Sequence, residues 1–144
     1  MATFVNDAAL FTISQKAILK DKKGRVLMME KAGKSHWDLP GGKLDAGEDM
    51  VEGIAREIEE ETKLDKVEVG PILYAGRRTF DEQGKPERVM IFYACETDQK
   101  LDKIKLSDEH SQWRMMSADD LKHEKKYEIN PIVRAALNVA FSKK

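Results

Sequence analysis

The strongest constraint in the sequence is a predicted helix with one apolar side, between Met50 and about Lys63. Asp49 and Glu52 form the Asp-x-x-Glu pattern that is typical of a helix start. Over the same stretch, apolar residues recur at three- and four-residue spacing: Val51, Ile54, Ala55 and Ile58. That spacing predicts an amphipathic α-helix, and its apolar side must pack against another layer of structure.

A cluster of glutamates lies on another side of this helix. Glu57, Glu60 and Glu61 stand at relative positions zero, three and four, so their side chains share one face. Like charges at this spacing destabilise a helix by roughly 0.2 to 0.5 kcal/mol per pair, so the cluster favours stability only if a cation joins it. One interpretation is a solvated face that Arg56 partly relieves. The Gly-Gly loop, Glu48 and Arg56 upstream of the cluster favour the other, a magnesium site, because magnesium binds carboxylates and substrate phosphates together.

Strand patterns flank the helix on both sides. Gln15–Lys20 and Arg25–Lys31 are short apolar runs separated by a turn-rich break, which predicts a hairpin. Trp37–Gly42 has the composition of a short strand that runs into a loop, because Pro40 lacks an N–H donor. Further strands are predicted over 67–79, 87–97 and 112–116, the first two joined by a turn near 83–86.

A last helix is predicted to begin at Asn130 as N-cap and Pro131 as first helical residue. Its apolar stripe, which should face the core, is Val133, Ala136, Leu137, Ala140 and Phe141. Strands, a helix, more strands and a final helix predict an α/β fold with helices packed on the faces of a mixed sheet. The chain has no repeat or low-complexity segment, and we expect a single domain over residues 1–144.

Charge and residue usage disfavour several classes of protein. Lys and Arg number 25 against 26 Asp and Glu, and the net charge of −1 gives no broad attraction to nucleic acid or anionic lipid. No apolar run approaches the roughly 20 residues that span a bilayer, so we expect a cytoplasmic protein. Cys95 lies in a strand pattern and is expected in the core. The histidines lack a metal-ligand spacing and are interpreted as surface residues: His36, His110 and His123.

The stretch from Gly42 to Leu64 closely resembles the Nudix box, which is a Gly, five residues, a Glu, seven residues and then Arg-Glu-apolar-any-Glu-Glu-any-Gly-apolar. The matching residues are Gly42, Glu48, Arg56, Glu57, Ile58, Glu60, Glu61 and Leu64. The one departure is Lys63, which stands where the box has glycine. The resemblance implies a Nudix fold, an α/β/α arrangement with a mixed β-sheet sandwiched between helices, in which the box forms a loop-helix-loop.

The resemblance also assigns roles within the box. Residues matching the ligands of Mg²⁺ or Mn²⁺ are the backbone carbonyl of Gly42 and the side chains of Glu57, Glu60 and Glu61, the three glutamates being the catalytic set. Glu48 and Arg56 match structural positions that brace the loop against the helix. These assignments predict a metal site at the junction of the Gly-Gly loop and the glutamate helix.

Further candidates lie outside the box. Glu109 resembles an acidic residue that many Nudix enzymes place in a loop at this stage of the chain, where it binds a further metal or takes a proton from water. Asp108 is a close second, and a solvated turn is the alternative. Trp37 is a candidate to stack on a base, with packing as the alternative. The predicted hairpin offers candidate contacts to substrate phosphates, or a solvated surface: Arg77, Arg78, Lys85 and Arg88.

The resemblance predicts an enzyme that uses metal ions and water to split a phosphoanhydride bond in a nucleoside diphosphate linked to another group. A nucleoside triphosphate that releases pyrophosphate is one candidate, because Trp37–Lys43 looks like the loop of MutT-like enzymes. The alternative is a silent Nudix domain that senses a nucleotide or binds a protein, and the intact glutamates argue against it. The expected partner is a nucleotide, with no membrane, no extended nucleic-acid surface, and a monomer or homodimer as the assembly.

Overall fold

The computed structural model describes residues 3–78, 87–123 and 127–143 of the chain. Its helices are α1 (Met50–Thr62), α2 (Ala118–His123), α3 (Pro131–Ser142) and the short 3-10 helix η1 (Leu101–Lys103). Its strands are β1 (Thr3–Val5), β2 (Ala8–Leu19), β3 (Val26–Lys31), β4 (His36–Asp38), β5 (Gly41–Lys43), β6 (Val67–Arg78), β7 (Glu87–Thr97), β8 (His110–Met116) and β9 (Glu128–Ile129). The predicted α/β class is confirmed.

The strands form two mixed sheets, where the sequence predicted one. The larger sheet has five strands in the order β1-β2-β7-β6, with β5 paired to β2. The smaller has four strands in the order β8-β3-β4-β9. Each is mixed, because β2 runs parallel to β7 and β4 runs parallel to β9 among otherwise antiparallel pairs. The predicted pairing of the strands at 67–79 and 87–97 is confirmed by β6 and β7, whose connecting turn lies outside the described residues.

The predicted hairpin between the first two apolar runs is wrong in its pairing. Its turn exists, since the Asp21 N–H donates to the Arg25 carbonyl at 2.9 Å and the Asp21 carboxylate accepts from the Arg25 guanidinium. Past an isolated bridge between Lys20 and Val26, however, the two strands diverge into different sheets. Both strands are apolar on both faces, so their residue pattern does not identify the neighbouring strand.

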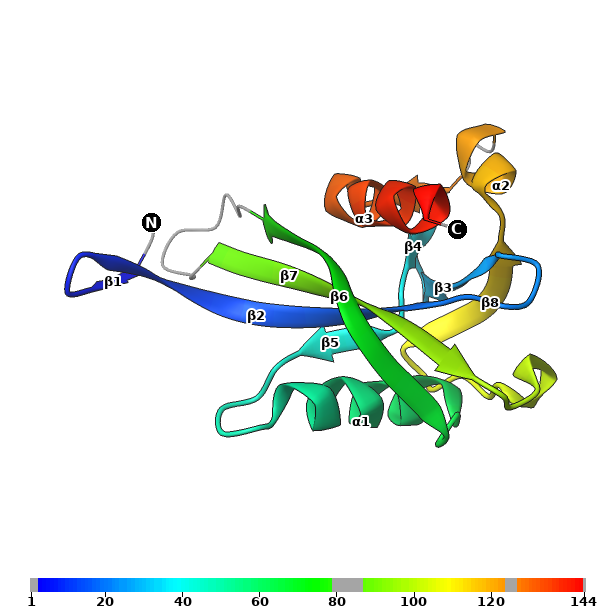
Figure 1. Cartoon of the computed structure of the whole chain (residues 1–144), viewed down its shortest axis with the longest axis horizontal. Helices are drawn as coiled ribbons and strands as arrows, with labels where there is room; N and C mark the ends of the chain where they lie inside the picture. The colour runs from blue at the N-terminus through cyan, green and yellow to red at the C-terminus, as the bar shows by residue number, and fades with distance from the viewer. Residues whose placement is uncertain (1–2, 79–86, 124–126, 144) are drawn as a thin grey trace.

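Helices cover both faces of the strands, α1 on one side and α3 on the other (Figure 1). Successive strand residues therefore enter different cores. Ile18 and Phe92 pack in the core under α3, whereas Leu19 and Tyr93 pack in the core under α1. Cys95 is buried in the α1 core, as predicted. Burial on both faces explains why these strands carry continuous apolar runs instead of a strict alternation.

Helix α1 begins where predicted, with the Asp49 carboxylate capping its first turn. Ile54 and Ile58 are buried as predicted, but Val51 is 51% exposed. Glu61 is buried instead, with only 4% of its surface exposed. It follows Ile58 by three residues and Ile54 by seven, a spacing that repeats one face of a helix. The sequence pattern placed the glutamates apart from the apolar face, and the structure puts one of them on it.

Lys63 ends α1 with a left-handed backbone, φ 66° and ψ 11°, at the position where the Nudix box has glycine. Its N–H still donates to the Glu59 carbonyl at 2.8 Å. A left-handed non-glycine residue costs roughly 1 to 2 kcal/mol, although glycine's freedom in the unfolded chain offsets part of any gain. We therefore expect Lys63→Gly to be neutral or to raise the free energy of unfolding by up to about 1 kcal/mol in a urea titration, with activity retained.

Glu59→Gly is the matched control for this change. Glu59 is exposed on the same helix but lies inside it, so glycine there should lower the free energy of unfolding by about 1 kcal/mol. If Lys63→Gly destabilises the protein as much as Glu59→Gly does, then the left-handed backbone at Lys63 does not carry the strain assigned to it.

The last helix also follows the prediction. The Asn130 side chain accepts from the Ile132 N–H at 2.8 Å, and Pro131 opens α3. Phe141 is partly buried against the core, and the fully buried residues of α3 are Val133, Ala136, Leu137 and Ala140. The strand predicted over 112–116 begins earlier, at His110. Within the described ranges, no helix has both the length and the apolar character that a membrane crossing requires.

Candidate active site

A cavity of about 600 Å³ lies between the two sheets and receives side chains from both. Its basic lining residues are Lys16, Lys31, Lys34, Lys43, Arg78 and Arg88. Its acidic lining residues are Asp38, Glu61, Glu109 and Glu128. Lys16 and Asp38 neutralise one another across 2.9 Å. The cavity therefore combines cationic walls with carboxylates that come from α1, β4, β9 and the residue before β8.

Arg56 holds the acidic residues of the box together. Its Nε donates to Glu48 at 2.7 Å, and one Nη donates to both carboxylate oxygens of Glu60 at 3.0 Å. The other Nη donates to Glu57 at 3.3 Å. The hydrogen bond from Arg56 lowers the pKa of Glu48. These contacts join Glu48 of the loop to Arg56 of α1, and the bracing role of the two residues stays a prediction.

The Gly-Gly loop lies directly against α1. Gly41 has φ 141°, and a Cβ there would overlap the carbonyl oxygen of Gln15 on the paired strand β2. Its N–H donates to the Glu61 carboxylate at 2.9 Å. A Cβ on Gly42 would stand 2.8 Å from a carboxylate oxygen of Glu57. Gly41 is thus needed for the loop to pair this closely with β2, whereas a side chain at Gly42 would displace the Glu57 carboxylate.

Glu61 is the most perturbed carboxyl group of the site. Burial is the main cause, and the charges of Glu57 and Glu109 add to it, so that the pKa of Glu61 rises to about 7. The Gly41 N–H and the charge of Lys16 oppose this rise. Burial likewise raises the pKa of Glu57. Neighbouring carboxylates at this depth favour protonation unless a cation enters among them.

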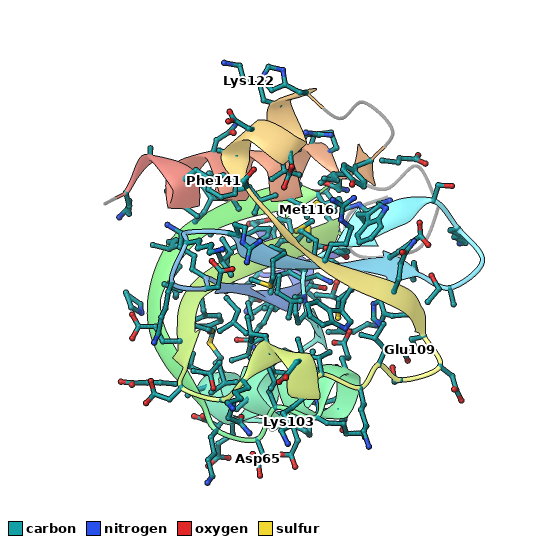
Figure 2. The ribbon with its side chains drawn as sticks, turned by 90° about the vertical axis from the view of Figure 1, so that its right-hand side faces the viewer. Asp65, Lys103, Glu109, Met116, Lys122 and Phe141 are labelled. Carbon is teal, nitrogen blue, oxygen red and sulfur yellow. The ribbon has the colours of Figure 1, made fainter. Side chains whose placement is uncertain are left out.

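Glu109 and His110 bring further ligating groups to Glu61 from the start of β8, in the smaller sheet. Glu109 lies where the chain enters β8 (Figure 2), and its carbonyl accepts from the Ala32 N–H at 2.9 Å. Ligating atoms of Glu61, Glu109 and His110 all lie within 4.8 Å of one another. The interpretation of His110 as a surface residue is wrong, since only 9% of its side chain is exposed. Burial lowers its pKa.

The structure separates the three glutamates that the sequence grouped. Glu61 faces the cavity, whereas Glu57 lies beside it under Gly42. Glu60 is 57% exposed and engaged by Arg56. All three share one stretch of helix, but Arg56 holds Glu60 in an orientation that leaves Glu61 as the carboxylate from α1 at the cavity.

The residues predicted to contact the substrate also differ in whether they face the cavity. Arg78 lines the cavity and stands opposite Arg88 in the β6–β7 pairing, so both cations face the same space. Arg77 turns away, forming an ion pair with Glu87 and covering the Phe11 ring, because neighbouring strand residues face opposite sides. Lys85 lies outside the described residues. Trp37 is 3% exposed and packs edge-on against Tyr127, which contradicts its role in base stacking.

Several lining residues escaped the sequence analysis. Lys16, Lys31 and Lys34 belong to no motif; strand pairing brings Lys16 and Lys31 to the cavity, and the segment between β3 and β4 brings Lys34. His110 was not predicted as a site residue because its partner Glu61 lies on a distant segment, so no spacing rule connects them.

Comparison with sequence families gives a match that covers most of the chain. The model described as NUDIX domain matches residues 11–136. A MutT-like protein of Streptomyces ambofaciens is 38% identical over 60 residues, which cover 42% of this chain and 38% of that protein. The asymmetrical bis(5'-nucleosyl)-tetraphosphatase of Rattus norvegicus is 31% identical over 97 residues, which cover 66% of this chain and 65% of that protein. Each match thus spans less than two thirds of the relative's length.

Solved structures resemble the fold along nearly its whole length. A MutT protein from Methanosarcina mazei Go1 has a TM-score of 0.73 at 27% identity, covering 93% of this chain and 96% of that one. An ADP-ribose pyrophosphatase from Streptococcus suis 89-1591 has a TM-score of 0.69 at 19% identity, covering 92% and 91%. At 19% identity, the likeness to the Streptococcus suis protein concerns the fold alone.

Proposed function

Because this chain belongs to the NUDIX domain family, we propose that it is a metal-dependent hydrolase that uses water to split a phosphoanhydride bond in a nucleoside diphosphate linked to another group. The observation that carries the proposal is the buried Glu61 carboxylate facing a cavity with cationic walls. A carboxylate so placed suits a cation, and the walls suit a polyphosphate. Neither feature serves the stability of the fold.

The donor groups fit a divalent metal ion. Burial and like charges hold the pKa of Glu61 near 7, and a cation among the carboxylates would relieve both effects. Carboxylate and carbonyl oxygens are the donors that magnesium and manganese prefer. We propose that Glu57, Glu61 and the Gly42 carbonyl hold Mg²⁺ or Mn²⁺, with Glu60 joining if its side chain leaves Arg56. When bound, such an ion would neutralise the charge of the substrate's phosphate oxygens and lower the pKa of a bound water.

Side chains of the protein would bind the phosphates, accept the proton and position the metal ligands. Arg78 and Arg88 face the cavity from adjacent strands and would bind the phosphates that lie farther from α1. Glu109 would accept the proton of the attacking water, because its carboxylate lies beside Glu61 and its backbone is hydrogen-bonded to Ala32, which follows β3. Arg56 would position Glu57 through their hydrogen bond. Catalysis is thus proposed to rest mainly on positioning and charge.

Hydrolysis of a nucleotide panel tests this function. We expect formation of a nucleoside monophosphate from the best substrate with Mg²⁺ to fall at least about 100-fold when EDTA is added and to return when Mg²⁺ is restored. The panel should hold a nucleoside triphosphate, a dinucleoside tetraphosphate, ADP-ribose and a UDP-sugar. The triphosphate is our first candidate, since Trp37–Lys43 resembles MutT-like enzymes and two relatives bear that name.

The second candidate function is a silent nucleotide sensor. It is distinguished by the same panel, because a sensor binds a nucleotide in calorimetry without forming a nucleoside monophosphate at any metal concentration. Tight binding with no turnover on any panel member would replace the hydrolase proposal with the sensor. The ion-paired state of Glu60 is the observation that favours this alternative, and the buried Glu61 opposes it.

A further inference from the structure

We propose that His110 is a nitrogen ligand of the metal site, and that it gives the site a preference for manganese or cobalt over magnesium. This inference rests on the proposed metal-dependent function. Every ligand supplied by the box is an oxygen, whereas the structure adds an imidazole from β8 to the same cluster. Imidazole nitrogen binds transition-metal ions better than it binds magnesium. The histidine would therefore change which cation the site selects.

The position of His110 fits ligation better than an ion pair. Its Nε2 stands 3.6 Å from the Glu61 Oε2, beyond the length of a hydrogen bond. Two ligand atoms that each lie about 2.1 Å from a shared ion are separated by about 3.0 Å at a right angle and about 4.2 Å when opposite. The observed separation falls inside this interval. An ion between the two groups would thus bind both without a change of backbone.

The imidazole is also uncommitted to other contacts. Its side chain is 9% exposed, and its Nδ1 finds no hydrogen-bond partner among the residues that the structure describes. A buried polar group in this condition costs roughly 1 to 3 kcal/mol. The atom that would bind the ion is Nε2, which faces Glu61 in the cluster that also contains Glu109, and these carboxylates indicate that the ligand is a cation.

The backbone holds His110 firmly toward the cluster. It is the first residue of β8, its N–H donates to the Ser107 carbonyl at 3.2 Å, and it pairs with Lys31 of β3. The preceding Glu109 carbonyl accepts from Ala32 at 2.9 Å. The imidazole therefore reaches Glu61 from a clamped strand start rather than from a free loop, which is the rigidity that a metal ligand requires.

Pulsed EPR on untagged protein loaded with Mn²⁺ tests the inference directly. We expect a nitrogen coupling to manganese in the unmodified chain, its loss in His110→Gln and its survival in His36→Gln. His36 is the matched control, because it lines the same cavity outside the cluster. A coupling that is absent from the unmodified chain, or that persists in His110→Gln, would overturn the assignment even if some variant failed to fold.

Calorimetry adds a second readout without substrate. His110→Gln should weaken Mn²⁺ and Co²⁺ binding at least about tenfold, since even removal of an outer-sphere partner costs roughly 10- to 100-fold, while Mg²⁺ binding changes less than about threefold. Equal losses for all three ions would refute the preference. Glu61→Gln separates the two proposals: unchanged Mn²⁺ binding in that variant would defeat the metal site itself, whereas lost binding beside an unaffected His110→Gln defeats only the nitrogen ligand.

Discussion

Glu61→Gln should lower turnover of the best panel substrate at least about 100-fold with Mg²⁺ present, because it removes the buried carboxylate that faces the cavity. The amide keeps the size of the side chain and can still accept from the Gly41 N–H, so the loop should stay in place. Steady-state kinetics over a range of Mg²⁺ concentrations measures the effect. Glu59→Gln, an exposed change on the same helix, should leave turnover unchanged.

The same substitution should stabilise the metal-free protein in a pH-dependent way. The pKa of Glu61 rises from 4.5 to about 7 on folding, so the folded state holds the proton more tightly than the unfolded chain does. The stability that this proton gives is present below pH 4.5 and is lost as the pH rises through about 7. Glutamine avoids that loss. We compare the free energy of unfolding of Glu61→Gln with that of the unmodified protein in EDTA. The advantage of the variant should be roughly 1 to 3 kcal/mol larger at pH 8 than at pH 4.5.

Two results would count against the assignment of Glu61. Turnover equal to that of the unmodified enzyme would show that the cavity carboxylate is not part of the metal site. A stability difference that stays constant between pH 4.5 and pH 8 in urea titrations would show that Glu61 is not perturbed in the folded state. The turnover result tests the function of Glu61 and the stability result tests its burial, so either assignment can be wrong while the other holds.

Glu109→Gln should slow the chemical step by roughly 10²- to 10⁴-fold, the range for loss of a general base, with folding intact. Its carboxylate lies within the cluster that contains Glu61 and His110. Single-turnover kinetics isolates this step from product release. Asp108→Asn is the control, because Asp108 is the exposed neighbour outside that cluster.

A loss of less than about threefold in Glu109→Gln would return Glu109 to an ordinary solvated turn. A large loss in Asp108→Asn alone would transfer the role to Asp108. Circular dichroism of both variants keeps these outcomes separate from unfolding.

The sequence predicted local structure well, because helix caps and glycine positions act over a few residues. The Asp49 cap and the Asn130 cap were both predicted in this way, and the glycine position of the box marked Lys63, the residue that ends α1. Sheet pairing was harder to predict. The strands at 15–20 and 25–31 are apolar on both faces, so neither showed that it would join a different sheet.

The candidate site was predictable only where one segment contains it. The box identified Glu57, Glu60 and Glu61 together, but their environments depend on neighbours that the motif does not include. Glu61 is buried because the Gly-Gly loop and β8 close over it, and His110 joins it through pairing between β3 and β8. Such contacts depend on tertiary structure, and a single sequence does not contain a local signal for them.

The divergence of β2 and β3 after Lys20 has a consequence for how such a protein can evolve. The proposed chemistry depends on α1, the Gly-Gly loop and the start of β8, whereas most of the cationic wall comes from β2, β6, β7 and the segment between β3 and β4. Mutations can therefore reshape the wall, one strand at a time, while the carboxylate cluster keeps its geometry. A lineage built on this plan can acquire a new specificity without first losing its reaction.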